Sequence, residues 1–285
     1  MSETRRPVFA LQGWYPADEA SCRRALEDYR RDCPEASGSV AGIVPHAGWH
    51  FSGRLATWTF CALSRKVEPA CVFVFGGHMG RADRPVCMPE GAFGTPLGPV
   101  EVDAELAAEA ASRFDCLCET PERFTPDNTL ELQMPILKFF WPQARAVAMQ
   151  VPADADLAEA IGAWAAAAGQ ESGLAAVAIG STDLTHYGAS YGFVPKGTGE
   201  AAHRWAKEEN DGPFIERLLA ADGPAAVKHA LENHSACCPG AAAAAVAFAR
   251  ARGASRGRLL GHVTSHEVDG RNGPSMWVGY ASIVY

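Results

Sequence analysis

Short apolar runs alternate with longer segments of helical character along the 285-residue chain, and this alternation constrains the fold more than any other feature. It is typical of α/β proteins, in which helices cover a sheet. Four runs are short, apolar and bounded by Gly or Pro, as buried strands are, and two further candidates lie near the end of the chain. The predicted strands are Val40–Pro45, Ala70–Phe75, Arg145–Gln150, Leu174–Ile179, Arg258–Thr264 and Met276–Val284.

Five segments between these runs are predicted helices. Ser52 is the expected N-cap of the second and Asp103 that of the third. The last two are rich in alanine, which has the highest helix propensity. The predicted helices are Asp18–Arg31, Gly53–Arg65, Asp103–Phe114, Asp154–Gly169 and Gly240–Arg252. The stretch Pro85–Pro99 is expected to be a long loop. Because no repeat, charge run or long linker marks a boundary, we expect residues 1–285 to form a single domain.

Composition excludes several classes of protein. A net charge of -8 and a pI near 5.6 argue against non-specific nucleic-acid binding, which needs a basic surface. The first ten residues do not resemble a signal peptide, and no apolar run is long enough to span a membrane. The nine cysteines lack a zinc-finger spacing and are expected to be reduced and mostly buried. We therefore expect a cytoplasmic protein without a nucleic-acid or membrane partner.

Three of the predicted strands are followed at once by side chains that can bind a metal. His46 follows the first strand, His78 the second, and Asp183 with His186 the fourth. In α/β sheets the carboxyl ends of the strands form the edge where ligands bind. Each residue alone could belong to an ordinary loop, but together they favour a shared metal or catalytic site. We assign no special role to four other histidines, which are His50, His203, His229 and His262.

Two adjacent cysteines, Cys237 and Cys238, precede the last alanine-rich helix. A helix dipole stabilises a thiolate at this position, so either cysteine could be a metal ligand or a nucleophile. The alternative is that both are small core residues. Aromatic residues near the motifs have two interpretations as well. Trp49 and Tyr187 could form a pocket wall for a planar substrate or pack in the core, whereas Phe51 is expected in the core.

Taken in order, these motifs resemble those of the Memo family, and the resemblance spans the chain from about Arg6 to Tyr285. The motifs that carry it are Pro45-His46-Ala47-Gly48 with Phe51-Ser52-Gly53, Gly77-His78, Leu130-Glu131-Leu132-Gln133-Met134-Pro135, Ser181-Thr182-Asp183-Leu184-Thr185-His186-Tyr187-Gly188, Ala236-Cys237 and Val278-Gly279-Tyr280-Ala281-Ser282.

The resemblance implies one α/β domain similar to the class III extradiol dioxygenases, with a central mixed β-sheet flanked by helices. Those enzymes hold Fe(II) with two histidines and a carboxylate, and a cysteine replaces the carboxylate in the Memo family. The ligands implied here are His46, His78 and Cys237, with Cys238 as a substitute for Cys237. Asp183 and His186 would stand at the edge of the site, and His186 would act as the acid–base group.

One position departs from the family pattern. The resemblance places a pocket histidine where this chain has Asn128, which can form hydrogen bonds but cannot titrate. Any proton transfer at this position is therefore lost. The residues expected in a substrate pocket are Trp49, Asn128, Glu131 and Tyr187.

Three functions are consistent with such a site. Two imidazoles and one anionic ligand leave coordination positions open, as in non-haem Fe(II) oxygenases, which suggests oxygenase-type chemistry on a small, phenolic substrate. The resemblance favours iron, and a thiolate ligand makes Cu(I) or Zn(II) an alternative. The second hypothesis is a non-catalytic iron- or copper-binding redox protein that contacts a protein partner. The third is a hydrolase with Cys237 as nucleophile, His186 as base and Asp183 as the orienting group.

Overall fold

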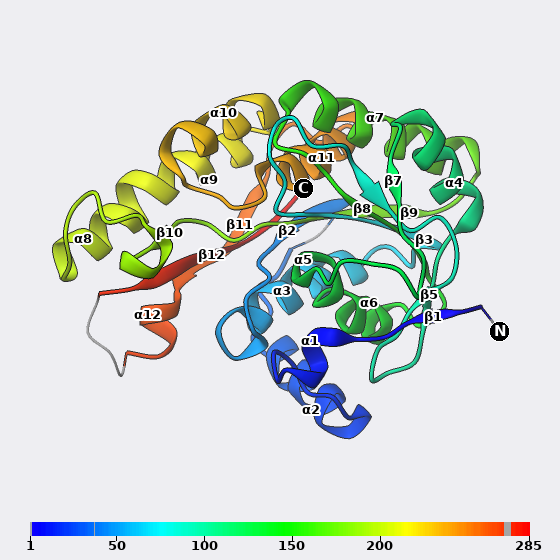
Figure 1. The fold of residues 1–285 in the computed structure, drawn as a ribbon, viewed down its shortest axis with the longest axis horizontal. Helices are drawn as coiled ribbons and strands as arrows, with labels where there is room; N and C mark the ends of the chain where they lie inside the picture. The colour runs from blue at the N-terminus through cyan, green and yellow to red at the C-terminus, as the bar shows by residue number, and fades with distance from the viewer. Residues whose placement is uncertain (1, 37, 271–274) are drawn as a thin grey trace.

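A mixed β-sheet forms the centre of the molecule, and helices lie against both of its faces (Figure 1). The computed structural model describes residues 2–36, 38–270 and 275–285. In spatial order the strands are β10 (His186–Tyr187), β12 (Trp277–Val284), β2 (Ala41–Val44), β9 (Ala176–Ser181), β3 (Cys71–Gly76), β8 (Arg145–Gln150), β4 (Val86–Cys87) and β7 (Leu117–Cys118). Strand β11 (Arg258–Thr264) pairs with β12, and a separate small sheet contains β1 (Thr4–Arg5), β5 (Ala92–Phe93) and β6 (Val100–Glu101). The predicted α/β class with a mixed sheet is confirmed.

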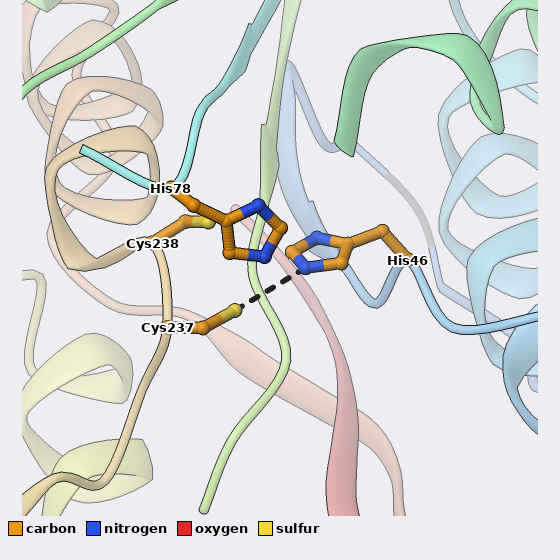
Figure 2. A group of neighbouring side chains, drawn as sticks. All are labelled: His46, His78, Cys237 and Cys238. Carbon is orange, nitrogen blue, oxygen red and sulfur yellow. Dashed lines mark hydrogen bonds between the residues drawn. The ribbon is translucent and has the colours of Figure 1, made fainter. Parts of the chain in front are cut away.

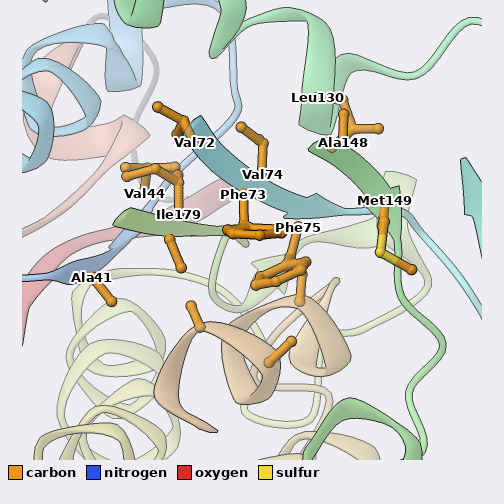
Figure 3. Close-up of a cluster of buried hydrophobic side chains, with 14 of the residues drawn as sticks. Ala41, Val44, Val72, Phe73, Val74, Phe75, Leu130, Ala148, Met149 and Ile179 are labelled. Atoms are coloured by element: carbon orange, nitrogen blue, oxygen red, sulfur yellow. The ribbon is translucent and has the colours of Figure 1, made fainter. Parts of the chain in front are cut away.

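The four central strands β2, β9, β3 and β8 run parallel, so their carboxyl ends lie at one edge of the sheet. Their side chains alternate between two faces of the sheet, and both faces are buried. The sequences of these strands are therefore apolar throughout, without the alternation of a half-exposed strand. Figure 3 shows Phe73 and Phe75 on one face of β3 and Val72 and Val74 on the other. All six predicted strands are present, with ends that differ by no more than two residues.

One layer of helices consists of α2 (Glu19–Arg30), α3 (Trp49–Ser64) and α6 (Met134–Phe140), and the opposite layer of α7 (Ala155–Glu171), α10 (Gly223–Asn233) and α11 (Pro239–Ala251) (Figure 1). The remaining helical segments are α1 (Val8–Leu11), α4 (Ala104–Arg113), α5 (Asn128–Glu131), η1 (Ala189–Tyr191), α8 (Glu200–Trp205), the π-helical η2 (Ala206–Asp211), α9 (Gly212–Leu219) and α12 (Ser265–Val268). All five predicted helices are present.

Small residues allow α11 to lie unusually close to its neighbours. A Cβ added to Gly162 in α7 would come within 2.1 Å of the Ala244 carbonyl oxygen in α11. A Cβ added to Gly240, at the start of α11, would come within 2.0 Å of the Pro152 oxygen. Since real Cβ atoms never approach this closely, both positions require glycine. This packing fixes the N-terminus of α11, and with it Cys237 and Cys238, at the carboxyl edge of the sheet.

Two expectations about local structure are wrong, and one helical region was missed. Helix α3 begins at Trp49 with Gly48 as its N-cap, and the Ser52 hydroxyl donates to the Ala47 carbonyl 2.8 Å away instead of capping the helix. The stretch Pro85–Pro99 contains the short strands β4 and β5, because neighbouring segments pair with it. The helical segments between residues 200 and 233 were not predicted, since Gly-Pro pairs interrupt their apolar pattern.

Within the described ranges no helix has both the length and the apolar character needed to cross a bilayer. All nine cysteines carry free thiols, and five of them are buried: Cys22, Cys71, Cys87, Cys116 and Cys238.

Candidate metal centre

The topology of the sheet brings the predicted ligands together. His46 comes two residues after the end of β2, and His78 comes two residues after the end of β3. Strand β9 lies between these two strands and is followed by Asp183. Cys237 precedes α11, which packs across β9 and β2. Segments separated by about 190 residues in the chain therefore meet at one edge of the sheet.

Four side chains form a cluster that has the size of a single-ion site (Figure 2). The ligand atoms of His46, His78, Cys237 and Cys238 all lie within 4.8 Å of one another. The Cys237 Sγ is 3.2 Å from His46 Nε2, and the two imidazole rings are 5.0 Å apart. Metal–ligand bonds of about 2.0 to 2.3 Å place neighbouring ligand atoms roughly 3 to 4 Å apart. The cluster therefore fits one ion with little rearrangement.

The surroundings of His46 fix its orientation. The side chain is 1% exposed, and its backbone N–H donates to Asp183 Oδ1 at 2.7 Å. Its Nδ1 pairs with the Ser181 hydroxyl at 3.0 Å, which leaves Nε2 directed at Cys237. The Asn128 amide donates to the His46 carbonyl at 3.1 Å. Partners of this kind orient metal-binding histidines and set which nitrogen coordinates the ion.

The charges around Cys237 favour a thiolate. Burial alone would raise the pKa of this thiol, but a hydrogen bond from Cys238 and the charge of His46 lower it well below its ordinary value. Burial and the neighbouring Cys237 sulfur raise the pKa of Cys238 well above its ordinary value. Cys237 is thus the anionic sulfur of the pair, and Cys238 is a thiol that donates to it.

His46 and Asp183 complete the electrostatics of the cluster. Burial would lower the pKa of His46, but the charges of Asp183 and Cys237 raise it to about 9. Burial raises the pKa of Asp183, and the charge of His46 opposes this shift. Without a cation in the site, an imidazolium therefore balances the thiolate, and a bound metal ion would take over that role.

A cavity of about 800 Å³ opens above the cluster, and His46, His78, Asn128, Asp183 and His186 all line it. The Nδ1 of His186 lies 3.1 Å from the Leu184 carbonyl oxygen. Because a carbonyl can only accept, Nδ1 carries the proton and Nε2 of the neutral ring has the lone pair. The contact with Leu184 therefore selects the Nδ1–H tautomer of the neutral His186 ring.

Three residues predicted for the pocket lie elsewhere. Trp49 is buried, packs on Tyr15 and donates from Nε1 to the Leu132 carbonyl at 3.3 Å. Glu131 accepts from the backbone N–H groups of Val8 and Phe9 at 2.9 and 2.7 Å, so it anchors the start of α1. Tyr187 is fully buried and stacks on a tryptophan, with its ring 4.3 Å from that of Trp277. The core interpretation is thus correct for both aromatic residues.

The remaining wall was not predicted. Phe51 packs against a core cluster, as expected, and also lines the cavity, and His50, which was assigned no special role, lines the cavity with a largely exposed side chain. Their proximity to His46 in the sequence was the available signal. Val278 and Tyr280 belong to the last motif of the resemblance, and further lining residues come from segments outside the motifs: Trp14, Tyr191, Ser265, His266, Asp269, Ser275 and Met276. His203, His229 and His262 instead pair with Thr264, Ser235 and Asp211.

Comparison with known proteins gives consistent matches over the whole chain. A family model described as "Memo-like protein" matches residues 5–284. A MEMO1 family protein of Pyrococcus abyssi is 33% identical over 98% of this chain and 98% of its own length. One of Thermococcus kodakarensis is 35% identical over 95% of this chain and 96% of its own. The crystal structure of an uncharacterized Escherichia coli K12 protein aligns with 87% of this chain and 99% of its own at 14% identity, with a TM-score of 0.49.

Proposed function

The chain belongs to the Memo family, and from this premise we propose that it binds one metal ion, with iron as the first candidate, through His46, His78 and Cys237. We propose further that the site performs oxygenase-type chemistry on a small, phenolic substrate. The observation that carries the proposal is the cluster of ligand atoms within 4.8 Å, whose two histidines line a cavity of about 800 Å³.

The donor set fits a ferrous ion that is open to substrate. Two imidazoles and one thiolate make three protein ligands, which is the number that non-haem iron oxygenases use. The raised pKa of Cys238 supports three ligands over four, because a protonated thiol is a poor ligand. A bound Fe(II) would supply open coordination positions for a substrate oxygen and for O₂.

The protein's own residues have two tasks in this proposal. His186 accepts a proton from the substrate hydroxyl at Nε2, since its Nδ1 is bound to the Leu184 carbonyl. The aromatic side chains of Trp14, Phe51 and Tyr191 line the cavity and offer faces for a planar ring. Asn128 lines the same cavity, where it can form hydrogen bonds to substrate but cannot exchange a proton.

Oxygen uptake tests this proposal. Protein loaded with Fe(II) under anaerobic conditions is mixed with O₂ and a panel of catechols in an oxygen electrode. We expect substrate-dependent uptake in the wild type. In His186→Gln we expect turnover to fall by about 100-fold or more, the usual contribution of a general base, with iron content unchanged. If iron binds and no catechol gives uptake, the oxygenase proposal fails.

A non-catalytic iron- or copper-binding role is the second candidate, and the position of Cys238 favours it. If this thiol lost its proton, two histidines and two cysteines within 4.8 Å would form a closed, four-ligand set. X-ray absorption of the loaded protein separates the two candidates. Two sulfur ligands support the closed site, and a single sulfur with oxygen ligands supports the open one.

The hydrolase hypothesis has less support. It assigned His186 as the base for Cys237, but the nitrogen beside Cys237 Sγ is Nε2 of His46, at 3.2 Å. His186 directs Nδ1 to a backbone carbonyl instead.

A further inference from the structure

A buried carboxylate binds the loop that carries His186. Asp211 is 1% exposed and is the last residue of the π-helical segment η2. Its Oδ1 accepts the backbone N–H of Thr185 at 3.0 Å, and the Thr185 hydroxyl donates to the same oxygen. Thr185 is fully buried and directly precedes His186 in the chain. The carboxylate therefore holds the residue next to the proposed base.

One peptide group joins this carboxylate to the His186 ring. The peptide group between Leu184 and Thr185 donates its N–H to Asp211. Its carbonyl oxygen, which belongs to Leu184, lies 3.1 Å from His186 Nδ1. A hydrogen bond to a carboxylate is stronger than one to a neutral acceptor, and consecutive hydrogen bonds polarise one another. The carboxylate of Asp211 thus makes the Leu184 carbonyl a better acceptor for the proton on Nδ1.

Neighbouring side chains hold the carboxylate and the threonine in place. Nε2 of His262, in β11, lies 3.3 Å from Asp211 Oδ2 and donates to it, because a carboxylate can only accept. Asn210 donates from its side-chain amide to the Thr185 hydroxyl at 2.8 Å and to the Asn233 carbonyl at 3.0 Å. π-Helical turns are rare and occur frequently at functional sites. Here such a turn brings two consecutive side chains to one threonine.

Strand β12 has a glycine where it passes the carboxylate. The Gly279 carbonyl accepts the Leu184 N–H at 2.8 Å, and the Gly279 N–H donates to the Thr185 carbonyl at 3.0 Å. A Cβ added to Gly279 would lie 2.3 Å from Asp211 Oδ2. These contacts explain Thr185 and Gly279, two motif residues to which the metal-site proposal gives no role.

On the basis of the function proposed for His186, we propose that Asp211 is its positioning residue. Through one peptide group, Asp211 stabilises the ring that carries its proton on Nδ1 and leaves the Nε2 lone pair for the substrate proton. Asp211 itself exchanges no proton. The alternative is that Asp211 only packs the loop against η2. The two roles differ in how the His186 ring responds when the charge is removed and the shape is kept.

Nuclear magnetic resonance of the ring nitrogens tests this role in the full-length, metal-free protein. Protein labelled with ¹⁵N-histidine is measured at about pH 8.5, where an ordinary histidine is neutral, and His186→Gln identifies the His186 signals by their absence. We expect the wild-type ring to be protonated mainly on Nδ1. In Asp211→Asn we expect the ratio of the Nδ1–H to the Nε2–H form to fall about fivefold, as a change of about 10 to 30% in one hydrogen bond implies.

A matched variant separates the charge of Asp211 from the general loss of a buried carboxylate. Asp103 is 6% exposed and caps α4, so Asp103→Asn should leave the His186 ratio unchanged. Urea denaturation of both variants measures the contribution of packing. An unchanged ratio in Asp211→Asn, or an equal change in the two variants, overturns the proposal. A wild-type ring protonated mainly on Nε2 also overturns it, and that result needs no variant that folds.

Oxygen uptake by the iron-loaded protein distinguishes this role from the function on which it rests. Asp211→Asn should lower turnover about fivefold, because the carboxylate also stabilises the imidazolium that forms when Nε2 takes the proton. Iron content and KM should stay near their wild-type values. A loss of iron with turnover per iron unchanged would contradict a role through His186. If no catechol gives uptake, the oxygenase proposal fails, and the tautomer ratio still decides the role of Asp211.

Discussion

The cavity contains one histidine–carboxylate pair at its buried end, which we call the floor (His46 and Asp183), and another at its exposed edge, which we call the rim (His50 and Asp269). The two pairs differ in their exposure to solvent. On the floor, His46 and Asp183 have side chains 1% and 4% exposed, and their side-chain atoms lie 3.9 Å apart. At the rim, His50 and Asp269 lie at a similar 3.7 Å, but their side chains are 64% and 25% exposed. Water and salt screen the rim pair, whereas the floor pair is not screened. A histidine–carboxylate pair therefore sets the orientation of a ligand on the floor and has little influence at the rim.

The largest effect is expected from disturbing the helix that holds the floor. In Gly240→Ala the new Cβ would meet the Pro152 backbone oxygen at 2.0 Å, so α11 must shift. We expect the free energy of unfolding to fall by about 3 kcal/mol, measured by urea denaturation. Gly80→Ala is the control, because its Cβ would meet Asp83 at an ordinary 3.4 Å on an exposed loop. It should change stability by no more than about 0.5 kcal/mol. Equal effects of the two variants would show that the close approach of α11 does not constrain the floor.

The matched carboxylates provide the second test. Asp183→Asn removes the negative charge beside His46, and we expect iron affinity to fall by about 10- to 100-fold, as for other partners of metal ligands. Asp269→Asn makes the same change beside His50 at the rim and should alter affinity by less than about 3-fold. Titration of Fe(II) with a competing chelator under anaerobic conditions measures both. Similar losses in the two variants would remove the distinction between floor and rim.

The same distinction explains what the sequence could predict. His46, His78 and Asp183 follow strands that were recognisable as apolar runs, and parallel strands bring their carboxyl ends to one edge. The rim residues Ser265 and His266 reach the cavity only because β11 pairs with β12, which no local pattern encodes. Phe51 lines the cavity and Trp49 does not, and the reason lies in the local helix geometry.

Trp49 begins α3, and each further residue of a helix is turned by about 100°. The Trp49 ring therefore packs on Tyr15, whereas Phe51 lines the cavity. Proximity to a motif in the sequence did not reveal which side chain faces the site. The positions of His46, His78 and Asp183 were predictable from topology, and most of the cavity wall was not.

The smallest effect concerns a residue that supports the rim. His203 is buried, pairs through Nε2 with Thr264 at 2.8 Å and packs on the ring of His266 at 5.1 Å. Burial lowers its pKa, so the folded protein resists a proton that the unfolded chain accepts near pH 6.5. His203 therefore contributes to the stability of the fold at pH values above its pKa in the unfolded chain. This contribution is lost as the pH falls through the pKa of His203 in the folded protein.

We expect the melting temperature to decrease between about pH 7.5 and 5.5, the range in which an ordinary histidine titrates, and to decrease less in His203→Gln. Thermal denaturation at a series of pH values measures this difference. Parallel pH profiles for the two proteins would mean that His203 does not contribute to the loss of stability in acid.

Metal content tests the central claim most directly. Wild type, His46→Ala, His78→Ala, Cys237→Ala and the control Cys238→Ala are incubated anaerobically with Fe(II), desalted and analysed for iron. The proposed three-ligand site predicts about one iron per chain in the wild type and in Cys238→Ala, and its loss in the other three variants. Iron that is absent from the wild type, or that persists in the His46, His78 and Cys237 variants, would contradict the proposed ligand set.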